Sequence, residues 1–116
     1  MAGALRWNSV QGFEVAPGIV RRVGHGEGVT LIRLSLVAGA RLPRHSHEHE
    51  QVVHVIAGRL RLSLFSPEGD HFEDLGPGDA YAIPPDLAHE ALAVEDVESL
   101  EVFTPRRDEL EASPAL

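Results

Sequence analysis

Apolar and polar residues alternate over short stretches along most of the chain, and glycine, proline or aspartate interrupts the pattern at short intervals. A period of two residues indicates β-strands, because successive side chains of a strand point to opposite faces of a sheet. The clearest stretch is RLRLSLFS, residues 59–66, in which polar and apolar residues alternate from Arg59 to Leu64. We predict further strands in the stretches 18–24, 28–39, 51–58, 71–85 (two strands), 89–95 and 97–105.

Turn residues separate these stretches and indicate the architecture. In the segment SPEGD, Pro67 presets φ and Gly69 can take a positive φ, as a hairpin turn requires. The pattern predicts one all-β domain over residues 1–116, with its core at about 12–105 and the form of a sandwich or closed barrel. Only the final segment, RRDELEASPAL, has helical character, so we expect a short C-terminal helix at most.

Composition and charge limit which binding partners and which cell compartment we expect. The 116 residues include 18 acidic and 10 basic ones, which gives a formal net charge of −8. This charge argues against nucleic acid and anionic membrane surfaces, although a local cationic site can still bind an anionic small molecule. The absence of cysteine excludes disulfides and thiolate chemistry. No signal-peptide pattern or apolar span of about 18 residues is found, so we expect a soluble, cytoplasmic protein with a small-molecule substrate.

Four of the seven histidines lie within residues 45–54. His45 and His47 are two positions apart, so on an extended strand their side chains share a face. Gln51 follows a predicted bend and can return to that face, and His89 begins a later strand that a barrel would bring to the same mouth. Three imidazoles and an amide oxygen suit one divalent transition metal (Zn, Ni, Mn or Fe) with open positions for water or substrate.

The spacing of these residues resembles the two sequence motifs of the cupin family. The resemblance implies a double-stranded β-helix, the jelly-roll barrel of cupins, with a metal bound inside its mouth by His45, His47, Gln51 and His89. The positions that match the first motif are Gly39, His45, His47, Gln51 and Gly58, and those that match the second are Gly78, Pro84 and His89.

The residue at position 51 departs from the cupin pattern, which usually has a glutamate there. A neutral amide leaves the 2+ charge of a metal undiminished, which favours Lewis-acid isomerase or lyase chemistry over oxygen activation by iron. Two alternatives stay open. The neighbouring Glu50 could be the fourth ligand instead, and His49 could join the site from the bend.

A narrower resemblance rests on the segments HSHEHEQVVHVIAG, GDAYAIPPDLAHEA and LEVFTPRRDEL, which together are similar to the small KdgF-type cupins of pectin and alginate degradation. That resemblance implies conversion of 4,5-unsaturated monouronates into linear ketonised sugars. It also implies pocket roles for Glu101 and Phe103, with Glu101 in place of an aspartate. We expect Glu101 to shuttle a proton between oxygen and carbon of the substrate.

Other residues suggest how a substrate and a second subunit could bind. Arginine suits bidentate recognition of a carboxylate, so Arg22, Arg33 and Arg41 are candidates to hold a sugar acid. Val52 and Ile56 are expected to point outward from the barrel, where a second copy would cover them in a homodimer. Two other functions remain open at this point: an Fe(II)-dependent dioxygenase, and a non-catalytic cupin that only binds a small molecule.

Overall fold

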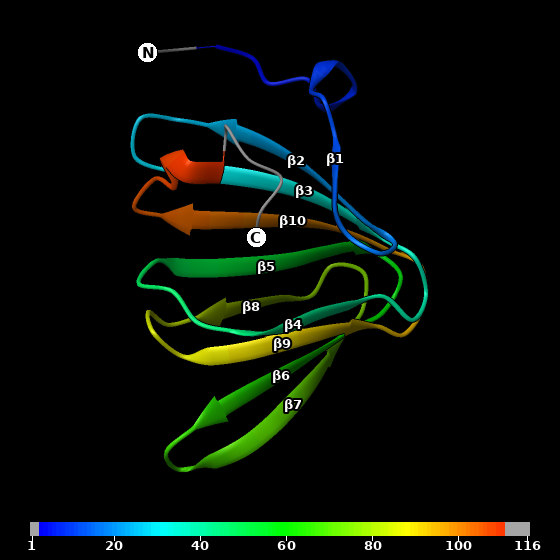
Figure 1. Cartoon of the computed structure of the whole chain (residues 1–116), viewed down its shortest axis with the longest axis vertical. Helices are drawn as coiled ribbons and strands as arrows, with labels where there is room; N and C mark the ends of the chain where they lie inside the picture. The colour runs from blue at the N-terminus through cyan, green and yellow to red at the C-terminus, as the bar shows by residue number, and fades with distance from the viewer. Residues whose placement is uncertain (1–2, 111–116) are drawn as a thin grey trace.

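The computed structural model describes residues 3–110 of the chain. Over this range the chain forms two antiparallel sheets that face each other (Figure 1). The six-stranded sheet has the order β1-β2-β3-β10-β5-β8, and the four-stranded sheet has the order β4-β9-β6-β7. The strands are β1 (Phe13–Ala16), β2 (Ile19–His25), β3 (Thr30–Leu36), β4 (Arg41–His45), β5 (Glu50–Ala57), β6 (Leu60–Ser66), β7 (Gly69–Leu75), β8 (Ala80–Ile83), β9 (Ala88–Ala93) and β10 (Val97–Thr104).

Alternating burial along the strands builds the core between the sheets. In β3, Ile32, Leu34 and Leu36 are buried, whereas the residues between them lie on the outer face at intermediate exposure. Burial of these apolar side chains is the main favourable contribution to folding. The same alternation continues through β5, β6, β9 and β10, which place their buried residues in one cluster. The prediction of an all-β jelly-roll barrel is therefore confirmed.

Two strands bring the site together because of their central places in the sheets. Strand β10 pairs with both β3 and β5, and strand β9 pairs with both β4 and β6. Residues far apart in the sequence thus become neighbours across the barrel interior. Figure 1 shows β10 and β5 in the six-stranded sheet opposite β4 and β9 in the other.

Some elements differ from the sequence-based expectation. Strand β1 was not predicted, and the strand expected to carry His45 and His47 is β4, which ends at His45. The C-terminal segment, expected to form a short helix at most, has a 3-10 turn, η2 (Asp108–Leu110), and its remainder lies outside the described residues. A second 3-10 turn, η1 (Trp7–Ser9), precedes β1. Within the described part of the chain, no helix is long and apolar enough to span a membrane.

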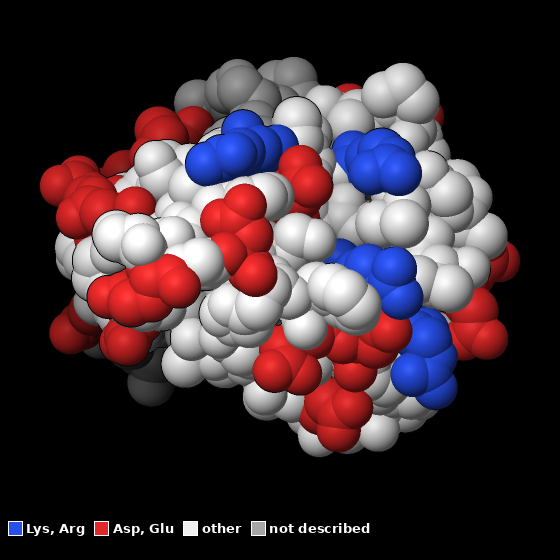
Figure 2. All heavy atoms as spheres, turned by 90° about the horizontal axis from the view of Figure 1, so that it is seen from below, with Lys and Arg blue, Asp and Glu red and all other residues white. Residues whose placement is uncertain are grey.

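The distribution of charge on the surface agrees with the acidic composition. Figure 2 shows acidic side chains spread over the face seen from below, with basic side chains among them. Arg61 on β6 and Asp74 on β7 form an ion pair, with an Nε–Oδ1 distance of 2.8 Å. This face carries no broad basic surface of the kind that nucleic-acid binding requires.

Candidate metal centre

Two histidines of the site, His45 and His89, face each other across neighbouring strands. His45 ends β4 and is the register partner of His89 on β9, and their ring centroids lie 4.4 Å apart. The register shifts between Leu42 and His45. Strict alternation from the inward-facing Leu42 would turn His45 outward, so this irregularity is what allows both side chains to line the barrel cavity.

The third histidine comes from the loop that joins β4 to β5. His47 was expected on a strand, but β4 has already ended at His45. Its ring nevertheless approaches both of the others, with centroid distances of 5.7 Å to His45 and 5.2 Å to His89. Within the described residues, these three histidines form a group whose ligand nitrogens all lie within 4.8 Å of one another, and it could hold a metal ion.

Backbone carbonyls fix the orientation of all three rings. The Nδ1 atoms of His45, His47 and His89 lie 2.7, 2.9 and 2.8 Å from the carbonyl oxygens of Pro43, His49 and Leu87. A carbonyl can only accept, so each Nδ1 carries the proton and donates it. Each Nε2 is then left with a lone pair, which is the state in which histidine binds a metal.

The environment keeps two of these imidazoles neutral. Burial, opposed by a backbone hydrogen bond, lowers the pKa of His89 to about 4. Burial also lowers the pKa of His47 below its ordinary value. Among the described residues, the buried Nε2 of His89 has no hydrogen-bond partner. A buried nitrogen lone pair without a donor is costly in an apo barrel and is satisfied when a cation binds.

Gln51 completes the donor set from strand β5. Its side chain is buried, and its Oε1 lies 2.9 Å from Nε2 of His47. Both atoms are acceptors, because Nδ1 of His47 already holds the ring proton. Two ligand atoms bound at right angles to one metal, each about 2.1 Å away, would lie about 3 Å apart. The geometry therefore fits a divalent cation shared by the amide oxygen and the imidazole.

The two alternatives for the fourth ligand occupy other positions. Glu50 is exposed and pairs with Thr104 on β10, so it lies on the opposite face of β5 from Gln51. His49 supplies its backbone carbonyl to His47, but its ring is not part of the three-histidine group. In the described residues, the Nδ1 of His49 is buried without a hydrogen bond, and we have no physical account of it.

Glu101 and Phe103 lie next to the candidate ligands, on the inner face of β10. Glu101 is buried, and it accepts hydrogen bonds from the amide of Gln51 at 2.5 Å and from the Ser99 hydroxyl at 3.2 Å. Burial raises the pKa of Glu101 to about 7, although the two hydrogen bonds and Arg107 oppose the shift. Phe103 pairs with Gln51 in the sheet, and its ring centroid is 5.5 Å from that of His47.

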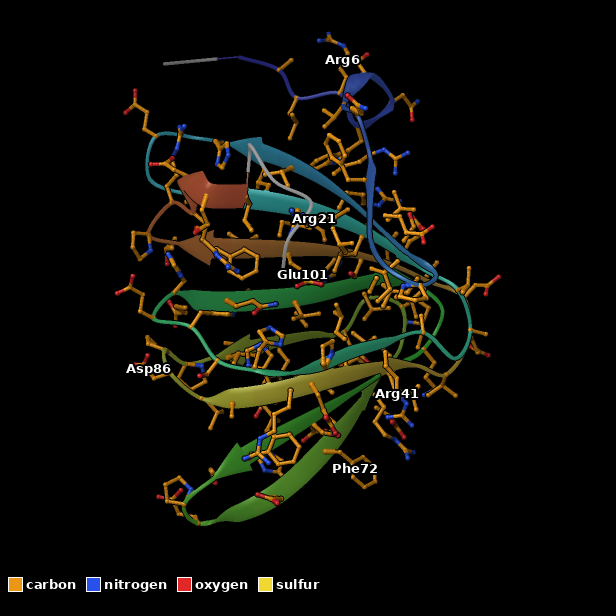
Figure 3. The ribbon with its side chains drawn as sticks, in the orientation of Figure 1. Arg6, Arg21, Arg41, Phe72, Asp86 and Glu101 are labelled. Atoms are coloured by element: carbon orange, nitrogen blue, oxygen red, sulfur yellow. The ribbon has the colours of Figure 1, made fainter. Side chains whose placement is uncertain are left out.

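The arginines predicted to bind substrate do not line the cavity, whereas Arg21 does. Arg22 and Arg33 are register partners on the outer face of the six-stranded sheet, where Arg33 forms an ion pair with Glu98. Arg41 is exposed on β4 (Figure 3). By contrast, Arg21 is 1% exposed and lines the cavity together with the candidate ligands. Figure 3 shows Arg21 and Glu101 pointing into the space between the sheets.

A second cavity arginine was not predicted from the sequence. Arg107 follows β10, and its guanidinium carbon lies 4.9 Å from the ring centroid of Phe103. Its backbone N–H donates to the Thr30 hydroxyl at 2.7 Å. Burial and the positive charge of Arg107 both lower the pKa of Arg21, which places two cations near one cavity of an acidic protein. The segment LEVFTPRRDEL contained the signal, since Arg107 lies two residues after the predicted strand 97–105.

The chain matches one protein family and is similar to several solved structures. The sequence pattern of the family described as "Cupin domain" matches residues 32–104. Among curated proteins, none matches the chain. The solved structure of KdgF from Halomonas sp. is similar over 95% of this chain and 99% of that chain, with 28% identity and a TM-score of 0.85.

Two further solved structures share the fold. An RmlC-like cupin from Shewanella frigidimarina NCIMB 400 has 20% identity and a TM-score of 0.84, and covers 95% of this chain and 96% of its own. A variant of oxalate decarboxylase from Bacillus subtilis has 23% identity and a TM-score of 0.80 over 87% of this chain, which corresponds to 29% of that chain. At these identities the likeness concerns the fold alone.

Proposed function

The chain belongs to the cupin family, as a small cupin that resembles KdgF, and on that premise we propose that it is a metal-dependent enzyme that opens or isomerises a small sugar acid. The proposed substrate is a 4,5-unsaturated monouronate. His45, His47, His89 and Gln51 would hold one divalent metal. That metal supplies Lewis-acid polarisation of a sugar oxygen without a change in oxidation state.

The observation that carries this proposal is the set of three imidazoles whose Nδ1 atoms are all bonded to carbonyl oxygens. The arrangement presents three lone pairs to one point beside a buried carboxyl group. A neutral amide as fourth donor suits polarisation better than oxygen activation, which favours a carboxylate ligand. The likeness to the KdgF structure over nearly the full length of both chains agrees with the sequence resemblance from which the substrate class is proposed.

The reaction needs one proton to move from oxygen to carbon. Opening the ring breaks the bond between C1 and the ring oxygen, and the hydroxyl on C1 loses its proton as the aldehyde forms. The former ring oxygen becomes an enol oxygen on C5, and ketonisation adds a proton at C4. Atoms and electrons balance as an isomerisation, so the reaction needs no oxidant or reductant.

Residues of the cavity have suitable chemistry for each part of this reaction. Glu101 would carry the proton, because a carboxyl group with a pKa of about 7 gives and takes protons readily near neutral pH. Arg21 and Arg107 would hold the substrate carboxylate, since guanidinium groups bind carboxylates in a bidentate way. Phe103 would pack against the sugar and limit the entry of water.

The proposal is tested by proton NMR of a 4,5-unsaturated galacturonate mixed with the metal-loaded protein. The control is the double variant His45→Ala/His89→Ala, which lacks two of the proposed ligands. We expect accelerated conversion to the open-chain keto-aldehyde or its hydrate with the wild-type protein and none above background with the control. Equal conversion rates in the two samples, or no acceleration in either, would contradict the proposed function.

A further inference from the structure

We propose that Glu101 is a positioning residue that fixes the amide of Gln51 with its oxygen toward the three histidines. The inference rests on the metal site proposed above and assigns to Glu101 a task separate from proton transfer. It concerns the orientation of one ligand, so it does not depend on which substrate the protein converts.

A glutamine amide has two chemically opposite ends of nearly the same size. The oxygen end can bind a metal, whereas the NH₂ end carries two protons and cannot. Nothing in the length or shape of the side chain prefers one orientation. A glutamine is therefore a dependable metal ligand only where a neighbouring group holds its NH₂ end.

Glu101 is that neighbouring group. The Nε2 of Gln51 donates to Oε1 of Glu101 at 2.5 Å, and the Oε1 of Gln51 then faces Nε2 of His47 at 2.9 Å. In its ionised form, Glu101 has no proton to offer, so it accepts from the NH₂ end and would leave a reversed amide unsatisfied. With a cation bound to Nε2 of His47, the reversed orientation would lose the hydrogen bond to Glu101, place the amide oxygen against the carboxylate and turn the NH₂ end toward the metal.

The fold holds the carboxylate in place for this contact. Gln51 pairs with Phe103 across β5 and β10, and Glu101 is two residues away from Phe103 on the same strand face. That diagonal is within reach of long side chains across a sheet. The hydroxyl of Ser99, fully buried, donates to the other carboxylate oxygen, Oε2, at 3.2 Å. Ser99 thus fixes one carboxylate oxygen of Glu101, while the other oxygen accepts the hydrogen bond from Gln51.

The same contact moves negative charge close to the metal site. The hydrogen bond from Nε2 to a carboxylate draws electron density toward the amide oxygen, much as a carboxylate behind a ligating histidine strengthens that ligand. The ligand itself would stay neutral, and the negative charge would lie one residue behind it on Glu101, whereas in the usual cupin pattern that charge is on the ligating glutamate.

The test measures the affinity of Co²⁺ and Zn²⁺ by competition with a chromophoric chelator, together with the visible absorption spectrum of bound Co²⁺. Glu101→Gln keeps the size of the side chain but can present either end of an amide to Gln51. We expect it to weaken metal binding by roughly tenfold to a hundredfold, the range for partners behind a metal ligand, and to change the Co²⁺ spectrum. Ser99→Ala is the matched control, because it alters Glu101 without touching Gln51, and should lose far less affinity.

The decisive comparison repeats Glu101→Gln in a Gln51→Glu background. Both ends of that carboxylate are oxygens, so no orientation needs to be fixed, and we expect Glu101→Gln to cause no loss of metal affinity there. A similar loss in both backgrounds would show that the effect of Glu101 does not depend on the orientation of the Gln51 amide, and would overturn the inference, as would unchanged affinity in Glu101→Gln alone. A wild-type protein that binds no metal would overturn the proposed function as well, whereas metal binding without sugar conversion would leave this inference standing.

Discussion

At the scale of single residues, the site depends on buried groups whose pKa values move in opposite directions. Burial lowers the pKa of His89 to about 4 and raises that of Glu101 to about 7. The contribution of His89 to the free energy of unfolding is fully present above its ordinary pKa of 6.5 and is lost as the pH falls toward 4. The contribution of Glu101 is fully present below its ordinary pKa of 4.5 and is lost as the pH rises through 7. Each effect amounts to about 3 kcal/mol and they oppose each other between pH 4.5 and 6.5.

Because the two effects oppose each other, we expect the free energy of unfolding to depend more strongly on pH in single variants than in the wild-type protein. In metal-free Glu101→Gln, the His89 effect is no longer opposed, so the free energy of unfolding should fall by about 2 kcal/mol or more between pH 7 and pH 5, with His47 acting in the same direction. In metal-free His89→Gln, the free energy of unfolding should instead rise as the pH falls from 7 to 5. Urea denaturation at the two pH values measures both changes. Equal slopes with pH in the two variants would show that these groups do not titrate in this way.

At the scale of elements, the turn between β5 and β6 controls how closely the central strands approach. Gly58 has a φ of +85°, and a Cβ atom placed there would lie 1.9 Å from the backbone oxygen of Asp96. Asp96 directly precedes β10, the strand that carries Glu101 and Phe103. The turn therefore needs glycine for two reasons, the positive φ and the close contact with the chain that enters β10.

A comparison of two glycines separates these reasons. Gly39 has a similar φ of +87°, but a Cβ atom there would meet nothing within 4 Å, so Gly39→Ala should cost only the backbone strain, about 1 kcal/mol. Gly58→Ala adds a clash with backbone and should lower the free energy of unfolding by about 3 kcal/mol or more. Thermal and urea denaturation of the two variants gives the difference. Equal destabilisation would mean that the turn can move away from Asp96 without cost.

At the scale of the whole molecule, one outer sheet face carries a group of apolar side chains. Ile56 is 42% exposed on the outer face of the six-stranded sheet, and Val52, Leu100 and Val102 lie on the same face at intermediate exposure. Val52 and Val102 are register partners at its centre. The sequence-based prediction of a homodimer through this face remains a prediction, and its physical basis is the apolar area that a second copy would remove from water.

Sedimentation analysis at micromolar concentration tests the assembly. We expect a mass of twice 12.6 kDa for the wild-type protein and a monomer for Val102→Lys, because a charge at the centre of an apolar contact is costly to bury. Phe72→Lys is the matched control. Phe72 is 56% exposed on β7, in the other sheet, and points away from the barrel in Figure 3. A monomeric wild-type protein, or dissociation by the control variant, would contradict the prediction.

The sequence by itself determined the strands and the set of candidate ligands. Period-two alternation is a local property, and it predicted the positions of β2, β3, β5, β6 and the later strands because each strand buries one face. The resemblance to the two cupin motifs selected His45, His47 and His89, which the structure brings together. Alternation within a strand and spacing within a motif are local features, so the sequence contains them.

Only the tertiary structure decided which side chains meet across the barrel. Alternation does not say which face of a strand is inside, so Arg22 was chosen from the sequence where the fold buries its neighbour Arg21. The register between β5 and β10 places Glu101 behind Gln51, and the irregularity in β4 turns His45 inward. Strand register is set by the packing of the whole core, and its consequences for the site are not readable from any local stretch of sequence.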